Sequence, residues 1–285
     1  GHTLWHDLFI NTRYNMKSQG FRNHVGVGAD LLRYRSGMEQ TDESDVLIVD
    51  SAGNPVLREE TKTALGHFNI SNLEGFWGVV RAAQNLDLPV IIGLSEGERD
   101  FIGLRQARAL VDSARTEFNQ SIFLSADHTS SLKRAQEAIG AGLDLIVFDR
   151  SELSPEDNIA ETKKCVELAR SVNPEILVEG ELGYIGKSSK MLDELPVGVA
   201  LDESSITKVE EAERFVKETG VDLFSPAVGN IHGMLKHAAN PRLFIQRTKE
   251  IRDVTGVPLV LHGGSGLTDE DFVAAIEAGV AIVHI

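Results

Sequence analysis

The chain has 285 residues, and 28 lysines and arginines stand against 43 aspartates and glutamates, which gives a formal net charge of −15. Such an acidic protein is repelled by nucleic-acid phosphates and anionic lipid surfaces, and no basic patch offsets the charge. The longest apolar runs fall far short of the roughly 18 residues that span a bilayer. The single cysteine, Cys165, excludes an internal disulfide and a cysteine-based zinc site. We therefore expect a cytoplasmic protein without a nucleic-acid or membrane partner.

The first part of the chain has a different pattern from the rest. Residues 1–15 contain two histidines and a tryptophan without clear periodicity, and we interpret them as a tag or vector sequence before Met16. Further on, residues 46–49 and 56–57 flank a turn rich in Gly, Asn and Pro, which predicts a small β-hairpin. We expect residues 1–63 to form an N-terminal extension and residues 64–285 to form the main domain.

From Ala64 onward, short apolar runs alternate with amphipathic segments at a spacing of roughly 30 residues. This alternation predicts eight buried parallel strands at 65–70, 88–94, 121–126, 143–148, 175–178, 221–225, 257–261 and 280–285. Helical patterns lie between them at 72–85, 100–118, 131–141, 155–172, 206–219, 241–254 and 268–278. Several start with the N-cap chemistry of Ser or Thr followed by acidic residues, as at Ser154 and Thr268.

Eight strands alternating with helices predict an α/β fold of the TIM (β/α)8 barrel type. The alternative is an open doubly wound sheet, but that fold normally has a glycine-rich first turn, and none follows the strand at 65–70. The pattern supplies seven helices for eight strands. We therefore expect the last helix of the barrel to be missing or truncated after Ile285.

Polar residues cluster where the predicted strands end, and in such a barrel the chemistry occurs at the carboxyl ends of the strands. Four of the seven histidines after Met16 lie at or just beyond a strand end. Three imidazoles from different strands match a catalytic zinc site, which has three protein ligands and one open position. The full set of candidate residues at these strand ends, histidines included, is Asn69, Ser95, Asp127, His128, Asp149, Ser151, Glu179, Glu181, His232, His262 and His284.

Three other features of these strand ends indicate chemistry. The segment 262–266, His-Gly-Gly-Ser-Gly, precedes the helix near Thr268 and predicts an anion-binding nest for a phosphorylated substrate. We favour Asp127 as a general acid and base, although it could instead orient an imidazole. Glu179 and Glu181 share one face of a strand, and an acidic pair facing into a barrel requires a metal or another cation.

The motifs at these strand ends resemble the class II, zinc-dependent ketose-bisphosphate aldolases, which include fructose-bisphosphate and tagatose-bisphosphate aldolases. The resemblance rests on segments 67–74, 89–95, 125–130, 147–151, 155–162, 178–183, 227–233 and 258–266, in that order. Typical examples are Ser-Ala-Asp-His-Thr-Ser at 125–130 and Val-Glu-Gly-Glu-Leu-Gly at 178–183. Together these segments cover the chain from about residue 64 to its end.

The resemblance implies a role for each matching residue. It assigns zinc to His128, His232 and His262, with Glu181 accompanying the metal, and it assigns catalysis to Asp127. Substrate binding falls on Asn69, Ser95, Gly233, Gly264, Ser265, Gly266 and His284. The implied cofactors are Zn²⁺ and, as an activator, a monovalent cation. The implied partner is a phosphorylated ketose, and the implied assembly is a homodimer or homotetramer.

The implied activity is reversible aldol cleavage of a ketose 1,6-bisphosphate to dihydroxyacetone phosphate and an aldehyde phosphate, a step of glycolysis. A Schiff-base lysine has no support, because no lysine lies inside an apolar run. Two departures favour an alternative, a catalytically impaired metal- and phosphosugar-binding protein. The loop at 184–194 lacks the family's Gly-Gly-x-Glu-Asp pattern, so Asp193 or Glu194 would have to substitute, and His284 stands where a substrate-binding asparagine is expected.

Overall fold

The computed structural model describes residues 46–49, 55–58, 63–186, 191–193, 202–237 and 240–285. The interpretation of residues 1–15 as a tag lies outside these residues. Within the described part, the predicted hairpin is present as two antiparallel strands, β1 (Val46–Val49) and β2 (Pro55–Arg58).

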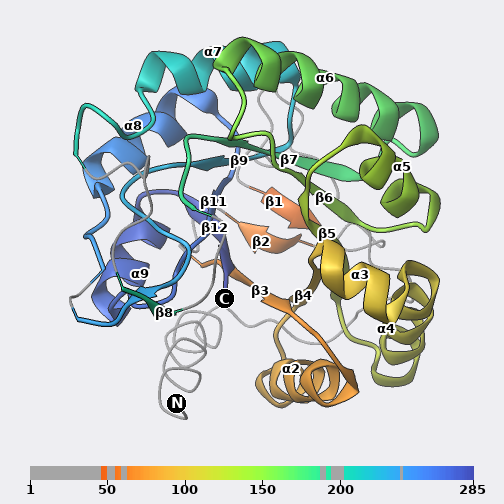
Figure 1. Cartoon of the computed structure of the whole chain (residues 1–285). Helices are drawn as coiled ribbons and strands as arrows, with labels where there is room; N and C mark the ends of the chain where they lie inside the picture. Colours follow the sequence, from red (N-terminus) through yellow and green to blue (C-terminus); the bar gives the residue numbers. More distant parts are fainter. Residues whose placement is uncertain (1–45, 50–54, 59–62, 187–190, 194–201, 238–239) are drawn as a thin grey trace.

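Eight parallel strands close into a barrel, in the order β11-β12-β3-β4-β5-β6-β7-β9, and Figure 1 shows the helices surrounding them. The predicted TIM barrel is therefore confirmed, and the open sheet is wrong. The strands are β3 (Leu65–Asn69), β4 (Val90–Leu94), β5 (Ile122–Thr129), β6 (Leu145–Phe148), β7 (Leu177–Leu182), β9 (Leu223–Pro226), β11 (Leu259–Leu261) and β12 (Val280–His284). The ring closes where β12 pairs with β3, so the last strand of the chain lies beside the first strand of the barrel.

Eight helices among the described residues follow these strands. They are α2 (Leu73–Leu86), α3 (Glu96–Ile102), α4 (Leu104–Phe118), α5 (Leu132–Gly140), α6 (Pro155–Val172), α7 (Val209–Thr219), α8 (Ile245–Thr255) and α9 (Asp269–Glu277). The N-caps predicted at Ser154 and Thr268 are present, and each hydroxyl accepts a hydrogen bond from a backbone N–H in the first turn. None of these helices is long and apolar enough to cross a membrane.

One predicted helix, at 100–118, is two helices in the structure. Gly103 separates α3 from α4 with a φ of 89°, a conformation that only glycine adopts readily. At its other end, α3 has Ser95 as its N-cap, in a capping box with Glu98. As a result, α3 begins directly at the end of β4, at the mouth of the barrel.

The barrel interior is apolar toward the amino ends of the strands, the lower layer, and polar toward their carboxyl ends, the upper layer. The lower layer consists of Leu65, Ile91, Phe123, Leu145, Val147, Leu177, Leu223, Val260, Ala281 and Ile282. Further along the same strands, the inward positions are His67, Ser125, Asp127, Glu179, Glu181 and His284, all 8% exposed or less. Buried polar groups are costly unless they meet partners. The polar layer therefore marks the functional end of the barrel.

A second small sheet lies in the loops beyond the polar end. The loop after β7 contributes β8 (Met191–Leu192) and the loop after β9 contributes β10 (Met234–Leu235), and the two strands pair in parallel. An ion pair of 2.7 Å between Lys236 Nζ and Asp193 Oδ1 connects the same loops. Asp193 therefore lies beside the segment that follows His232.

Candidate active site

The end of β5 has an irregular backbone that directs two consecutive side chains into the barrel mouth. Its pairing with β6 shifts register between Ala126 and Thr129, and His128 has a positive φ of 41°. A regular strand would send Asp127 and His128 to opposite faces. The shift instead allows the Asp127 carboxylate to contact Asn69 while the His128 imidazole lies beside His262. A left-handed conformation at a non-glycine residue is strained and is often associated with function.

Three histidines converge above the polar layer, as the sequence predicts. Among the described residues, His128, His232 and His262 each offer a ring nitrogen within 4.8 Å of the others. Nε2 of His128 lies 3.3 Å from Nδ1 of His262. Two nitrogens, each about 2.1 Å from one tetrahedral ion, are about 3.4 Å apart, so this separation fits a shared metal.

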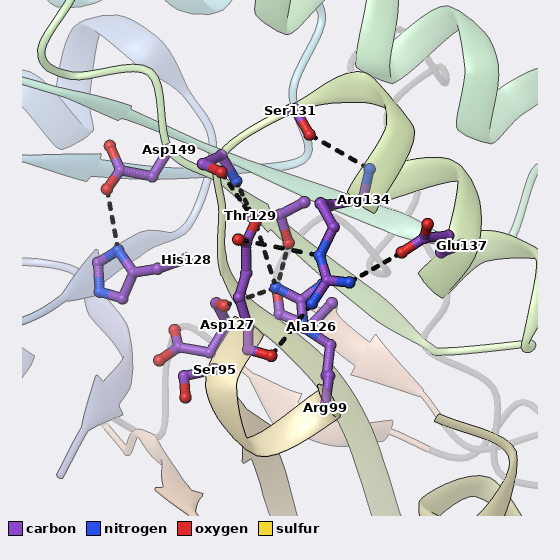
Figure 2. Close-up of polar contacts among 12 residues, drawn as sticks. Ser95, Arg99, Ala126, Asp127, His128, Thr129, Ser131, Arg134, Glu137 and Asp149 are labelled. Carbon is purple, nitrogen blue, oxygen red and sulfur yellow. Dashed lines mark hydrogen bonds and ion pairs between the residues drawn. The ribbon is translucent and has the colours of Figure 1, made fainter. Parts of the chain in front are cut away.

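The other nitrogens of two of these rings are bound to carboxylates. Nδ1 of His128 lies 3.0 Å from Asp149 Oδ2, a contact that Figure 2 shows, and Nε2 of His262 lies 2.6 Å from Glu179 Oε1. When both rings are neutral, the form that binds metal, and the carboxylates are the acceptors, the nitrogens that face each other carry lone pairs. Carboxylates behind imidazoles are the usual second layer of a metal site. Nε2 of His232 is buried and has no hydrogen-bond partner among the described residues, which leaves it free to bind a metal.

Electrostatics at this cluster also favour a cation. Burial raises the pKa values of Glu179 and Glu181 well above the usual range, and neighbouring carboxylates, Asp127 and Asp149 among them, raise them further. Burial alone would lower the pKa of His128, but Asp127, Asp149 and Glu181 raise it to about 10. A bound cation removes the repulsion that raises the carboxylate pKa values. The donor set therefore fits a divalent metal held by three histidines, with Glu181 beside them.

The pKa values of His232 and His262 shift in the direction opposite to that of His128. Burial, followed by the proximity of His128, lowers the pKa of both His232 and His262 to about 3. Both rings are neutral at neutral pH, the form that binds metal.

Asp127 lies beside the three histidines and contacts two other strands. Asn69 Nδ2 donates a 2.8 Å hydrogen bond to Oδ2 of Asp127, and Nδ1 of His284 lies 3.3 Å from Oδ1. Burial alone would raise the pKa of Asp127, but His128, His284 and His67 lower it well below its usual value. The carboxylate is therefore ionised at neutral pH, the form that accepts a proton.

The loops predicted to bind phosphate lie together on one side of this site. The side chain of Asn240 connects them: its Nδ2 donates to the carbonyl oxygens of Gly233 (2.9 Å) and Ser265 (2.6 Å). Its Oδ1 accepts a 3.0 Å hydrogen bond from the backbone N–H of Leu235. Asn240 thus fixes the loop after His232 to the loop after His262.

The helix end near these loops differs from the predicted anion nest. The first turn of α9 carries Asp269, Glu270 and Asp271, and the Thr268 hydroxyl accepts the N–H of Asp271. Three carboxylates at this helix N-terminus oppose a phosphate. Any phosphate contacts at this end of the barrel therefore depend on backbone groups of the 263–266 loop, where Gly263 and Gly266 have positive φ values of 64° and 85°.

Two predicted substrate residues have other contacts in the structure. The Ser95 hydroxyl accepts a hydrogen bond from the N–H of Glu98 as the cap of α3. The His284 ring stacks on His67 and lies against His262. Substrate binding by either residue stays a prediction.

Sequence reasoning left several supporting residues without a role. Asn158 Nδ2 donates to the carbonyl of Glu181, and Asn230 Nδ2 donates to the carbonyl of His262, so two buried amides fix strands that carry site residues. Both lie inside the segments that carry the resemblance, which was the available signal. Arg99, drawn in Figure 2, is buried and donates a hydrogen bond to the backbone carbonyl of Asp127. His67 begins another of these segments, but its place inside an apolar strand gave it no role.

Replacing Asp149 by asparagine tests the role of the carboxylate behind His128. We expect metal affinity to fall roughly 10- to 100-fold, because the imidazole loses the acceptor that orients it. Activity should return at saturating metal, since Asp149 contacts the ring and not the reacting atoms. Competition with a chromophoric chelator measures the affinity. An unchanged affinity would show that Asp149 does not orient His128.

The fold and site together define a TIM-barrel protein with a candidate metal site, in which a histidine cluster and an ionised aspartate lie at the carboxyl ends of the strands. The model of class II fructose-bisphosphate aldolases matches residues 58–285. The chain belongs to this family. It is therefore an aldolase, a carbon–carbon lyase, and the family is generally metal-dependent.

Individual relatives agree with this assignment. A fructose-bisphosphate aldolase of Staphylococcus aureus (strain Mu50) is 34% identical over 230 residues, which cover 80% of this chain and 77% of the relative. A fructose-bisphosphate aldolase of Geobacillus stearothermophilus is 34% identical over 229 residues, which cover 79% of this chain and 75% of the relative. The crystal structure of the YdjI aldolase from Escherichia coli K12 superimposes with a TM-score of 0.68 at 30% identity, covering 80% of this chain and 77% of that one.

Proposed function

We propose that this protein is a zinc-dependent aldolase that reversibly cleaves a ketose 1,6-bisphosphate of the fructose or tagatose type. The products are dihydroxyacetone phosphate and an aldehyde phosphate. The observation that carries the proposal is the convergence of His128, His232 and His262 beside the ionised carboxylate of Asp127.

The three histidines are the proposed zinc ligands, with Glu181 as the acidic residue that accompanies the metal. Bound there, Zn²⁺ supplies a Lewis acid that withdraws charge from the ketone and hydroxyl oxygens of the substrate. Neutral His232 and His262 provide nitrogen lone pairs, and Asp149 and Glu179 orient the rings of His128 and His262.

Asp127 is the proposed catalytic acid and base. Its ionised carboxylate takes the proton of the C4 hydroxyl during cleavage of the C3–C4 bond and returns that proton during condensation. Asn69 holds Oδ2, and Oδ1 lies 3.3 Å from Nδ1 of His284, so both side chains orient the carboxylate for the reacting hydroxyl. The carbon-bound proton is moved by an acid of the 184–194 loop. Asp193 is one candidate, and Glu194 lies outside the described residues.

Phosphate recognition is local, because the protein carries a net charge of −15. We propose that backbone groups at Gly233, Gly264, Ser265 and Gly266 bind one phosphate, with Asn69 and Ser95 nearer the reacting carbons. His284, the other residue assigned to the substrate, acts on it through Asp127. Oriented backbone N–H groups bind anions without a positive side chain.

Replacing Asn240 by aspartate tests this phosphate assignment. The variant keeps the acceptor for Leu235 but sets a carboxylate oxygen against the carbonyls of Gly233 and Ser265, which separates the two loops. We expect KM for the bisphosphate to rise roughly tenfold with kcat little changed, because ground-state and transition-state binding are lost equally. Steady-state kinetics measure both. Unchanged KM in a folded variant would place the phosphate elsewhere.

The remaining assignments follow the family. We propose a cytoplasmic enzyme of glycolysis, a homodimer or homotetramer, with its aldolase domain at residues 64–285 and a monovalent cation as activator. Light scattering of the purified chain measures the assembly, and assays with and without K⁺ or Na⁺ measure the activation.

Metal removal tests the zinc assignment. Treatment with a chelator should abolish cleavage, and one equivalent of Zn²⁺ per chain should restore it. Fructose 1,6-bisphosphate, tagatose 1,6-bisphosphate and unphosphorylated fructose are then compared as substrates. We expect a bisphosphate to be cleaved and the free sugar to be inert. Full activity after complete removal of metal would contradict the proposal.

A further inference from the structure

A stack of imidazole rings lies next to Asp127. His67 of β3 and His284 of β12 occupy paired positions on adjacent strands, and their rings stack with centroids 3.6 Å apart and planes 6° apart. On its other face, His284 lies against His262, with centroids 3.8 Å apart. His284 is therefore held between two rings, and all three are almost completely buried.

This geometry opposes a second metal site at these residues. His67, Asp127 and His284 offer donor atoms within 4.8 Å of one another. An imidazole binds a metal through a lone pair in the plane of its ring, and nearly parallel planes do not meet at one ion. His67 and His284 cannot bind the same metal without rotating out of the stack.

The position of His284 relative to Asp127 indicates a different role. Nδ1 of His284 lies 3.3 Å from Oδ1 of Asp127, while Asn69 Nδ2 donates to Oδ2. Each carboxylate oxygen thus lies against a side chain from β3 or β12, and the backbone carbonyl of Asp127 accepts a hydrogen bond from Arg99. A general base must be held close to the proton that it takes, and misplacement costs rate.

A glycine on the adjacent strand β4 leaves the space that the ring of His67 occupies. A Cβ at Gly93 of β4 would lie 2.0 Å from Oδ1 of Asn69 and 2.3 Å from Cε1 of His67. Only glycine at this position leaves room for both side chains. The imidazole of His67 and the amide of Asn69 therefore share one niche at the level of Asp127.

We propose that His284 is a positioning residue for Asp127 and that His67 fixes the ring of His284 by stacking. The proposal rests on the proposed function, in which Asp127 moves the hydroxyl proton. His284 directs its Nδ1 toward the carboxylate, and the stack prevents the ring from turning away. The imidazole thereby takes a task that an asparagine amide could also perform, because Nδ2 of asparagine lies at the same distance along the side chain as Nδ1.

Two substitutions at residue 284 test this role. His284→Leu fills similar space without a donor, and His284→Asn keeps a donor at the δ position but removes the ring. We expect kcat for bisphosphate cleavage to fall roughly 100-fold in the leucine variant and less than tenfold in the asparagine variant, with KM within about twofold in both. A space-filling role predicts the reverse order, with leucine tolerated and asparagine not, and would overturn the proposal.

A partial reaction separates this outcome from failure of the proposed function. Exchange of the carbon-bound proton of dihydroxyacetone phosphate with solvent needs the metal and the loop acid but not Asp127. We expect this exchange and the zinc content of one per chain to be unchanged in both variants. A wild-type enzyme without cleavage would refute the proposed function, whereas an active wild type with an equally active His284→Leu variant would refute only the positioning role.

His67→Ala tests the support by stacking. We expect a loss in kcat of roughly tenfold with unchanged zinc content, because His284 keeps its donor but loses the ring that holds it. Unchanged kcat in the folded variant would overturn the role of His67. Loss of one of two bound metal ions per chain in either the His67→Ala or the His284→Leu variant would show a second metal site instead.

Discussion

Alanine at position 232 removes the metal and, with it, the cleavage activity. His232 is the best ligand to test, because its Nε2 has no hydrogen-bond partner among the described residues, so the substitution breaks no other contact of that atom. Loss of the metal removes several kcal/mol of transition-state stabilisation, a fall in kcat/KM of roughly 10³-fold or more. Metal analysis after gel filtration, together with a cleavage assay, measures both effects.

A matched variant controls for the loss of a histidine as such. His237 is an exposed histidine five positions further on, and His237→Ala should keep both metal and activity. If His232→Ala retains zinc at full occupancy, the assignment of the three ligands is wrong. Retained fold in both variants is checked by their thermal unfolding.

Replacing Asp127 by asparagine has the second large effect, and it acts on chemistry rather than on metal binding. The amide accepts no proton at neutral pH, so kcat for cleavage should fall by roughly 10²- to 10⁴-fold. Zinc content should stay at one per chain, since the proposed ligands are unchanged. Exchange of the carbon-bound proton of dihydroxyacetone phosphate should persist, because that step does not use Asp127.

The contrast with Asp149→Asn makes this prediction specific. Asp149 contacts the Nδ1 of His128, so its loss weakens metal binding, and saturating metal should restore the rate. No metal concentration should restore Asp127→Asn. Recovery of Asp127→Asn with added zinc would show that Asp127 orients an imidazole, the alternative reading of its sequence position.

The barrel was predictable because strands buried on both faces read as continuous apolar runs. The ends of the strands were harder to predict at the site. The run at 121–126 overlaps β5, which continues to Thr129, and the run at 175–178 overlaps only the start of β7, which continues to Leu182. Both extensions carry polar residues that face into the barrel, so the apolar pattern stops where the function begins.

The convergence of His128, His232 and His262 was predictable from their positions at strand ends, whereas the stack around His284 was not. His67 and His284 lie near opposite ends of the barrel sequence and meet because β12 pairs with β3. No periodic pattern in a sequence indicates that two rings stack. The space at Gly93 of β4 is recognised only once the side chains of β3 are placed beside it. The break at Gly103 was missed because the apolar pattern of α3 and α4 is nearly continuous across it.

The most direct test measures zinc per chain and the release of triose phosphate from fructose and tagatose 1,6-bisphosphates in the same preparation of the full chain. We expect one zinc per chain and cleavage of at least one of the two sugars, with activity proportional to zinc content. Stoichiometric zinc without cleavage of any ketose phosphate would contradict an active aldolase and would instead support a metal- and phosphosugar-binding protein of aldolase ancestry.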